Sequence, residues 1–115
     1  MFSLRRSDVS IGVGNLAGKG VYANRDFAKG EIVIRYNLQP LSLEEFNNLP
    51  KSEKIFVHTH FGQIFLYGEP ERYVNHSDNP NTIQDLIKQC DIAARDILKG
   101  EMITTDSTKD DLSNF

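Results

Sequence analysis

The feature that most constrains this chain is a short motif that occurs twice. The stretches "ANRDFAKGEIVI" (residues 23–34) and "AARDILKGEMIT" (residues 93–104) share the frame A-x-R-D-x-x-K-G-E. In each copy a short strand leads into Arg-Asp, and Lys-Gly makes a turn before a second strand. Gly30 and Gly100 are the natural residues for the positive φ that such a turn requires. The repeat predicts two related hairpins in a β-rich fold with pseudo-symmetric corners, and does not by itself indicate a function.

Alternating apolar residues predict further strands. Apolar residues alternate with polar or small ones over residues 9–13 and 32–36, which is the period of half-buried strands. The runs "KIFVH" (residues 54–58) and "QIFLY" (residues 63–67) are rich in β-forming residues. We therefore expect a mainly β fold.

One helix is encoded clearly before residue 80. In "LSLEEFNNLP", Ser42 and Glu45 have the spacing of a capping box, and Leu41 and Phe46 occupy the two staple positions that flank it. Pro50 is expected to end this helix. The stretch "IQDLIKQC" (residues 83–90) places its isoleucines, leucine and cysteine on one helical face, which predicts a second short helix or a turn.

Size, charge and cysteine content narrow the class of protein. A chain of 115 residues with 39% hydrophobic content suits one compact domain with a stable core. The net charge of -3 argues against nucleic acid as the main partner, because phosphate binding requires a basic face. Cys90 is the single cysteine, which excludes a disulfide framework and a multi-cysteine zinc site. No apolar run has membrane-spanning length and the first residues lack the apolar core of a signal peptide, so we expect an intracellular, cytoplasmic protein, with the nucleus as the alternative.

The glycine-rich segment "GVGNLAGKG" (residues 12–20) does not fit a nucleotide site. Its glycines are too close together for a phosphate loop, the lysine is not followed by Ser or Thr, and no helical pattern follows for a dinucleotide fold. Gly18 and Gly20 either make a turn or allow a ligand to approach the backbone. The turn is favoured, because glycine commonly serves there.

Two other catalytic patterns are also weak. His58 and His60 would share one face of a strand, as metal ligands do, but no third ligand lies at a helpful spacing, so no metal site is expected. His76 and Ser77 are adjacent on one loop and lack a nucleophile elbow, which argues against a hydrolytic triad.

The most polar stretch is "RYVNHSDNPN" (residues 72–81). Tyr73 and Val74 are strand-like, and the residues from Asn75 onward have the Asx- and Pro-rich chemistry of a tight turn. Its composition alone predicts a structured loop and leaves open whether the loop binds a ligand.

Three segments, taken in order, resemble the SET-domain family of protein-lysine methyltransferases. "GKGVYANRDFAKGEIVIRY" is similar to the family's N-terminal motif, and "RYVNHSDNPN" to its central R-F-I-N-H-S-C-x-P-N motif, with Tyr73 for Phe and Asp78 for Cys. "DIAARDILKGEMITTDS" is similar to the closing A-x-R-D-I-x-x-G-E-E-L-T motif, which ends in a Tyr-Asp-Tyr-like stretch. The resemblance runs from about residue 18 to residue 107, and the short middle resembles minimal SET proteins without accessory domains.

The resemblance implies a particular fold. It is mainly β, with several small curled sheets, one or two short helices, and a C-terminal pseudoknot in which the closing segment passes through a loop near the N-H-S motif. We expect residues 1–107 to form the SET domain and residues 108–115 to form a polar C-terminal tail.

The resemblance also implies S-adenosylmethionine as the cofactor. The backbone at Lys19 and Gly20 would face its methionine part, and the His76 main chain would lie near its adenine. Arg72 is explained equally well by an ordinary ion pair with a carboxylate. The cofactor-binding residues that the resemblance implies are Lys19, Gly20, Arg72, Tyr73, Asn75 and His76.

The implied reaction brings a lysine side chain through a narrow channel to the methyl donor. Alignment and removal of water then supply much of the catalysis. The amine must arrive neutral, although free lysine has a pKa of about 10.4. A cationic sulfonium and a desolvated channel both lower that value.

The closing motif departs from the family at the positions where the family places its aromatic pair. Thr105 and Ser107 stand there, so the candidate catalytic positions carry short hydroxyl side chains in place of the tyrosine that orients the amine. The remaining candidates to supply an aromatic ring or to cover the site are Tyr36, Tyr67, Tyr73, Leu112 and Phe115.

The leading hypothesis is an S-adenosylmethionine-dependent protein-lysine N-methyltransferase. Its partner is then a lysine-containing protein or peptide, with neither nucleic acid nor a membrane as partner. The alternative is a catalytically degenerate SET domain that acts as a cofactor-binding or protein-interaction module. A β-rich domain with coincidental motifs is the third interpretation, and a homodimer whose partner completes the site is a further hypothesis.

Overall fold

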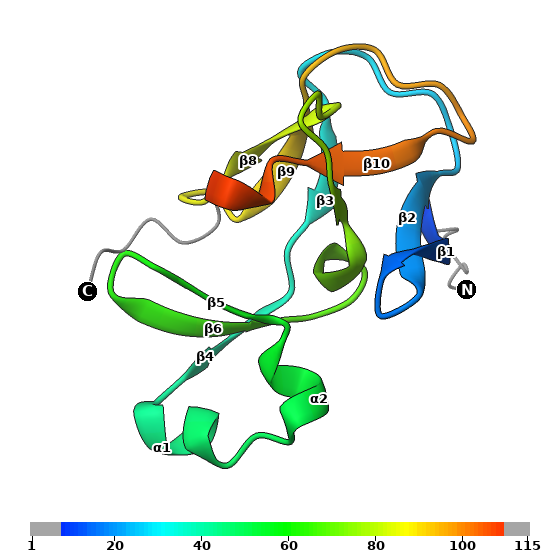
Figure 1. Ribbon diagram of the computed structural model, residues 1–115. Helices are drawn as coiled ribbons and strands as arrows, with labels where there is room; N and C mark the ends of the chain where they lie inside the picture. The colour runs from blue at the N-terminus through cyan, green and yellow to red at the C-terminus, as the bar shows by residue number, and fades with distance from the viewer. Residues whose placement is uncertain (1–7, 110–115) are drawn as a thin grey trace, which may run out of the picture.

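The computed structural model describes residues 8–109 and shows a mainly β protein with three small sheets and two short α-helices, as predicted (Figure 1). The strands are β1 (Val9–Leu16), β2 (Lys19–Ala23), β3 (Ile32–Arg35), β4 (Leu38–Leu41), β5 (Val57–His60), β6 (Gln63–Tyr67), β7 (Asn75–His76), β8 (Thr82–Asp85), β9 (Cys90–Ala93) and β10 (Met102–Thr105). The helices are α1 (Leu43–Asn47), α2 (Lys51–Lys54) and the 3₁₀ turns η1 (Glu71–Tyr73) and η2 (Ser107–Lys109). The positions Leu112 and Phe115, and most of the predicted tail, lie outside the described residues.

The first sheet joins the beginning of the chain to its closing segment. Its strand order is β1-β2-β10-β7, with β10 antiparallel to β2 and parallel to β7. The parallel register aligns Thr104 with Asn75 and Thr105 with His76, and the Ser77 amide donates to the Thr105 carbonyl at 2.9 Å. The closing strand, β10, therefore lies directly against the N-H-S segment, residues 75–77. Its threading through a loop stays a prediction.

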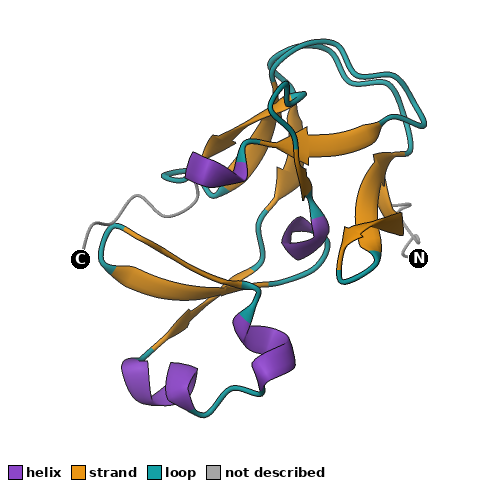
Figure 2. Cartoon of the chain, in the orientation of Figure 1, coloured by secondary structure: helices purple, strands orange, loops and turns teal. Residues whose placement is uncertain are grey.

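The other two sheets are antiparallel and complete the scaffold. Their strand orders are β3-β9-β8 and β4-β6-β5, and α1 and α2 lie in the connection between β4 and β5 (Figure 2). The predicted capping box is confirmed: the Ser42 hydroxyl accepts from the Glu45 amide, and the Glu45 carboxylate accepts from the Ser42 amide. Pro50 follows α1 and stands at the N-cap position of α2, a second short helix at a place where the sequence analysis predicted none.

Residues 83–90 form part of a β-hairpin: the predicted turn is confirmed at residues 86–89, and the helix given as its alternative is wrong. β8 pairs with β9, and Gln89 adopts a φ of 56° in the turn that joins them. β9 also pairs with β3, and this pairing on both sides outweighs a weak helical pattern. As a result, Ile83 and Ile87 are 60% and 83% exposed instead of lying on a buried helical face.

The two copies of the repeated motif pair with each other. Phe27 and Ile97 form an antiparallel bridge in which the amide of each donates to the carbonyl of the other, at 2.8 and 2.9 Å. Both side chains are buried, at 1% and 0% exposure. The connection from β2 to β3 and the connection from β9 to β10 run side by side in Figure 1. Each links a strand of the first sheet to a strand of the second. The predicted pseudo-symmetric corners are therefore one paired unit.

Reciprocal side-chain bonds reinforce this pairing. The Lys29 amide donates to the Asp96 carboxylate at 2.9 Å, and the Lys99 amide donates to the Asp26 carboxylate at 2.8 Å. Each aspartate of the repeated Arg-Asp therefore caps the turn of the other copy. This cross-capping gives the repeated Asp a structural role.

Each turn is also closed from within by the glutamate of its K-G-E sequence. Gly30 and Gly100 have φ angles of 92° and 94°, as the motif predicts. The Glu31 carboxylate accepts from the Ala28 amide at 2.8 Å and pairs with Arg25 at 3.0 Å. The backbone amide first, and then Arg25, hold the pKa of Glu31 below its ordinary value. The second copy repeats this arrangement with its own arginine and backbone amide.

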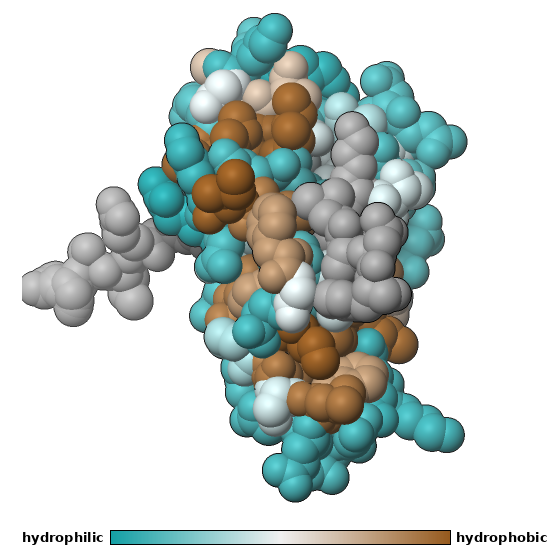
Figure 3. All heavy atoms as spheres, turned by 90° about the vertical axis from the view of Figure 1, so that its left-hand side faces the viewer, coloured by the Kyte–Doolittle hydropathy of each residue, from teal (hydrophilic) through white to brown (hydrophobic). Residues whose placement is uncertain are grey.

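The hydrophobic core forms around the paired turns. It joins residues of the first two sheets to η1 and to Phe56, which precedes β5. Its members with at most 1% exposure are Val21, Phe27, Ile97 and Ile103. On the face drawn in Figure 3, hydrophobic residues run down the middle while polar residues gather at both ends. Within residues 8–109, the helices are too short to span a bilayer.

Replacing Ile97 with alanine is expected to lower the free energy of unfolding by about 2–5 kcal/mol, because the side chain is fully buried at the paired turns. Urea unfolding measures the change. The adjacent Leu98 is the matched control: it is 61% exposed, so Leu98→Ala should change stability by no more than about 0.5 kcal/mol. Equal losses in the two variants would contradict the central position of the Phe27–Ile97 pair.

Candidate functional site

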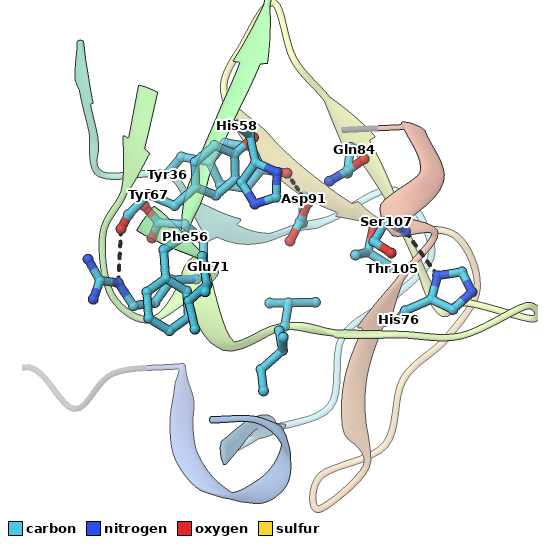
Figure 4. Close-up of a pocket in the computed structure, with 14 residues that line it drawn as sticks. Tyr36, Phe56, His58, Tyr67, Glu71, His76, Gln84, Asp91, Thr105 and Ser107 are labelled. Atoms are coloured by element: carbon cyan, nitrogen blue, oxygen red, sulfur yellow. Dashed lines mark hydrogen bonds between the residues drawn. The ribbon is translucent and has the colours of Figure 1, made fainter. Parts of the chain in front are cut away.

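A cavity of about 260 Å³ lies where the three sheets meet η1 and the closing segment (Figure 4). Its wall takes His58 and Tyr67 from the third sheet, Asp91 from the second and Thr105 from the first. The other lining residues are Leu16, Tyr36, Ile55, Phe56, Glu71, Arg72, Val74, His76, Gln84 and Ser107. Segments far apart in the chain therefore share one pocket.

Asn75 joins the N-H-S segment to the hairpin formed by β1 and β2, which is called the first hairpin below. Its side chain is 4% exposed, donates from Nδ2 to the carbonyls of Lys19 and Tyr73, both at 2.9 Å, and accepts from the Asn15 amide at 2.8 Å. An amide is required, because the same side chain must donate and accept. Asn75 thus positions the backbone of Lys19 beside the N-H-S segment.

His76 connects the N-H-S segment to the closing segment. Its Nδ1 accepts a hydrogen bond from the Ser107 amide at 3.1 Å, which Figure 4 shows, so the ring proton of the neutral form lies on Nε2. Nε2 then donates to the Asp78 carboxylate at 2.9 Å. The imidazole is therefore held in one tautomer at the edge of the cavity.

Both predicted catalytic positions, Thr105 and Ser107, lie on the cavity wall. Thr105 is 5% exposed, and its Oγ1 is buried without a hydrogen-bond partner among residues 8–109. Ser107 is exposed, and its main chain bonds to His76. Both residues with hydroxyl side chains therefore lie at the cavity, and their catalytic roles stay predictions.

The other predicted cofactor residues take different places. Gly20 packs inside the protein: an added Cβ would lie 3.1 Å from Met102 Cε and 3.2 Å from the Val13 carbonyl oxygen. The Lys19 amine lies 4.9 Å from the centre of the Tyr73 ring. Tyr73 is buried and makes an edge contact with Phe56, outside the cavity lining. The structure therefore brings His76 and Arg72 to the cavity, whereas Lys19, Gly20, Tyr73 and Asn75 lie outside its lining.

Arg72 forms the ion pair that the sequence analysis gave as one explanation. Its guanidinium bonds both oxygens of Glu53, at 3.1 and 3.2 Å, donates to the Tyr67 carbonyl at 2.9 Å, and lies 4.5 Å from the Phe56 ring centre. Burial lowers the pKa of Arg72, and the hydrogen-bonded Glu53 more than offsets this, so the pKa lies above its ordinary value. Arg72 fastens α2 to η1.

Aromatic residues reach the cavity from outside the closing motif. Tyr36 and Tyr67 both line it, with ring centres 5.6 Å apart. Of the three tyrosines named as alternative aromatic sources, these two are in place and Tyr73 is not. Figure 4 shows them grouped with His58 and Asp91, opposite Thr105 and His76.

Two carboxylates in the cavity wall were missed by the sequence analysis. Asp91 is 2% exposed and accepts a hydrogen bond from the Tyr36 hydroxyl, and Glu71 is 5% exposed. Asp91 lies inside a strand, next to the buried Cys90, and an acid there is itself a signal because carboxylates are rarely buried without a partner. Glu71 lies four residues before Asn75 in the sequence, and its local sequence gives no indication that it is buried.

The histidines of β5 do not form a metal centre. His58 lines the cavity, whereas His60 is 1% exposed, stacks on Phe65 with ring centres 4.6 Å apart and bonds the Tyr67 hydroxyl at 3.2 Å. Within residues 8–109, no three His, Cys, Asp or Glu side chains are arranged to hold a metal ion. His60 therefore packs in the interior, whereas His58 lies in the cavity wall.

The fold and the cavity define a small β domain in which a closing strand and an N-H-S strand run in parallel beside one pocket. The family model of the SET domain matches residues 18–106. The chain belongs to the SET-domain family, which confirms the resemblance found in the three motifs.

Similar proteins are histone-lysine methyltransferases. Histone-lysine N-methyltransferase 2D of Homo sapiens and of Mus musculus are each 29% identical to this chain over 120 residues. The match covers 88% of this chain and only 2% of each relative, so the chain corresponds to a small part of those proteins.

Solved structures show the same fold. A Plasmodium falciparum protein described as a candidate histone methyltransferase has a TM-score of 0.68 and 21% identity, over 89% of this chain and 94% of that one. A humanized mutant of the Chaetomium thermophilum Polycomb Repressive Complex 2, bound to the inhibitor GSK126, has a TM-score of 0.71 and 25% identity, over 91% of this chain and 15% of that one.

Changing Asn75 to aspartate is expected to lower the free energy of unfolding by about 3 kcal/mol, because an acceptor would face the carbonyls of Lys19 and Tyr73. Chemical denaturation at neutral pH measures this loss. Asn79→Asp makes the same change at an exposed position and should cost no more than about 0.5 kcal/mol. A stability for Asn75→Asp close to that of Asn79→Asp would show that the clamp is dispensable.

Proposed function

We propose that the chain is a SET-type protein-lysine N-methyltransferase that uses S-adenosylmethionine. The observation that carries the proposal is that one cavity brings His76 of the N-H-S segment together with Thr105 and Ser107 of the closing segment. Membership of the SET-domain family and similarity to histone-lysine methyltransferases support the same activity. The proposed substrate is a lysine side chain of a protein or peptide.

The residues beside the N-H-S segment fit the proposed cofactor. The buried Thr105 Oγ1, without a partner among residues 8–109, offers a hydrogen-bonding atom to a polar guest. We assign the cofactor to the main chain around His76, which lines the cavity, and to the main chain of Lys19 and Gly20, which Asn75 holds next to that segment and outside the cavity lining. When bound, S-adenosylmethionine supplies an electrophilic methyl group on a sulfonium centre. The Asn75 clamp contributes by fixing the position of the Lys19 main chain.

The chain's own residues then bind and orient the amine. Phe56, Tyr36 and Tyr67 provide an aromatic wall suited to the methylene stem of a lysine. The Tyr36 hydroxyl donates to Asp91, which fixes the orientation of both groups. Such a wall also limits the access of water, and alignment in a dry site is the main requirement of methyl transfer.

Incubation with labelled S-adenosylmethionine and a mixture of histones, from neutral to alkaline pH, should transfer label to lysine. Tyr36→Phe removes a hydroxyl from the cavity wall and should slow transfer about tenfold or more through lost alignment. Tyr22→Phe is the matched control, because the Tyr22 hydroxyl bonds the Val13 carbonyl on the first hairpin. No incorporation at any pH would reject the proposal.

The alternative function is a degenerate SET domain that binds its cofactor or a partner without turnover. The observation that favours it is that Thr105 and Ser107, at the positions where the resemblance implies an aromatic pair, carry short hydroxyl side chains on the cavity wall. Calorimetry with S-adenosylmethionine separates the two forms of this alternative: binding without turnover indicates a cofactor-binding module, and no binding indicates an interaction scaffold.

Placing a tyrosine at position 107, where the resemblance implies one, distinguishes the degenerate domain from the active enzyme. If the domain is degenerate, Ser107→Tyr should gain methyl transfer by about a hundredfold over the original chain, and Ser107→Phe, which lacks the hydroxyl, should not. If the original chain is an active enzyme, the gain from Ser107→Tyr should stay within a few-fold. Single-turnover assays with both variants measure the difference.

A further inference from the structure

Glu71 is a buried carboxylate with one oxygen left over. Its Oε2 accepts hydrogen bonds from the amides of Asn37, at 2.6 Å, and Gly68, at 3.0 Å. Its Oε1 is buried and has no hydrogen-bond partner among residues 8–109, and the residue lines the cavity. Leaving a carboxylate oxygen buried and unbonded is costly, so this atom indicates that the cavity accommodates a hydrogen-bond donor.

Asp91 adds a second buried carboxylate to the same cavity. It lies on β9 between β3 and β8, and is 2% exposed. The Tyr36 hydroxyl donates to its Oδ1, so the carboxylate is held in a fixed orientation. Two acids thus reach the cavity from separate elements, η1 and β9 (Figure 4).

Arg72, the arginine in the cavity wall, is bonded to groups other than Glu71 and Asp91. The other titratable groups that line the cavity are Tyr36, His58, Tyr67, Arg72 and His76. The Arg72 guanidinium bonds the Glu53 carboxylate and the Tyr67 carbonyl. The cavity therefore presents two carboxylates while its permanent positive charge is bonded to Glu53, and this favours a cationic guest.

The chemistry of the wall selects an organic cation. No three His, Cys, Asp or Glu side chains between residues 8 and 109 are arranged to hold a metal ion. A primary ammonium offers three donors, which suits the unbonded Glu71 Oε1 and a second carboxylate. The rings of Phe56, Tyr36 and Tyr67 supply apolar surface that suits the aliphatic stem of an organic cation.

We propose that Glu71 and Asp91 make this cavity a receptor for a primary ammonium group, which binds in its protonated form. The identity of that group as the end of a substrate lysine rests on the proposed function, whereas recognition of the ammonium does not depend on methyl transfer. The two acids supply a charged interaction with the amine, which the hydroxyls of Thr105 and Ser107 on the same wall do not supply.

This arrangement has a consequence for the pH dependence of methyl transfer. Two nearby carboxylates favour the charged amine and raise its pKa. Transfer requires the neutral amine, so the bound ammonium must first lose a proton to solvent. Activity should therefore rise toward alkaline pH, and removing one carboxylate should move the rise to lower pH by about one unit.

Binding of small amines tests the receptor without any methyl transfer. The probes are N-acetyl-lysine methylamide and its neutral counterpart N-acetyl-norleucine methylamide, titrated into the full chain and followed by NMR. The lysine probe should shift the amide signals of Thr105 and Ser107, and the norleucine probe should not. Glu71→Gln and Asp91→Asn should each weaken lysine binding about tenfold.

The matched control is Glu69→Gln, which makes the same charge change two residues away at an exposed position. It should bind the lysine probe as the original chain does. Both cavity variants keep an oxygen that accepts the native bonds from Asn37, Gly68 and Tyr36. Equal binding of the two probes, or unchanged binding in both cavity variants, would overturn the proposal, and the probe comparison needs no variant to fold.

The methylation assay separates failure of the receptor from failure of the proposed function. If the chain methylates histones and neither cavity variant moves the pH profile, the receptor is wrong and the enzyme assignment stands. If no methylation occurs but lysine binding depends on Glu71 and Asp91, the receptor stands and the enzyme assignment fails. A shift of the profile to lower pH in Glu71→Gln, absent in Glu69→Gln, supports both.

Discussion

The rest of the structure depends on the reciprocal bridge between Phe27 and Ile97. Because the two repeated turns pair back to back, the strands before and after them are placed in two sheets at once: β2 against β10, and β3 against β9. The cross-capping by Asp26 and Asp96 fixes the same geometry through the turn amides. One local motif, used twice, therefore joins the beginning of the chain to its closing segment.

The cavity is a product of that pairing. β10 carries Thr105 to the N-H-S segment, and β9 carries Asp91 into the wall opposite. Burying Asp91 and Glu71 costs free energy that an apolar wall would not. The unbonded Glu71 Oε1 and the buried Asp91 in one cavity wall are the physical basis for proposing that the cavity receives a cation.

Local interactions were the predictable part of the fold. The capping box at Ser42 and Glu45 and the positive φ of Gly30 and Gly100 follow from contacts within a few residues, and the structure has all of them. The extended residues on both sides of the turn at residues 86–89 were not predictable, because they depend on the pairing of β9 with β3, whose sequence lies far away. The short helix α2 was missed because a four-residue helix carries too little periodic pattern to be recognised.

The same distinction holds for the site. The sequence by itself determined the family, the N-H-S segment and the hydroxyl residues Thr105 and Ser107, because each is written in a contiguous motif. Only the tertiary structure decided that Glu71 and Asp91 share a cavity with them, and that Asn75 clamps the first hairpin. Burial and proximity arise from the packing of distant strands, and no local pattern encodes which side chains that packing brings together.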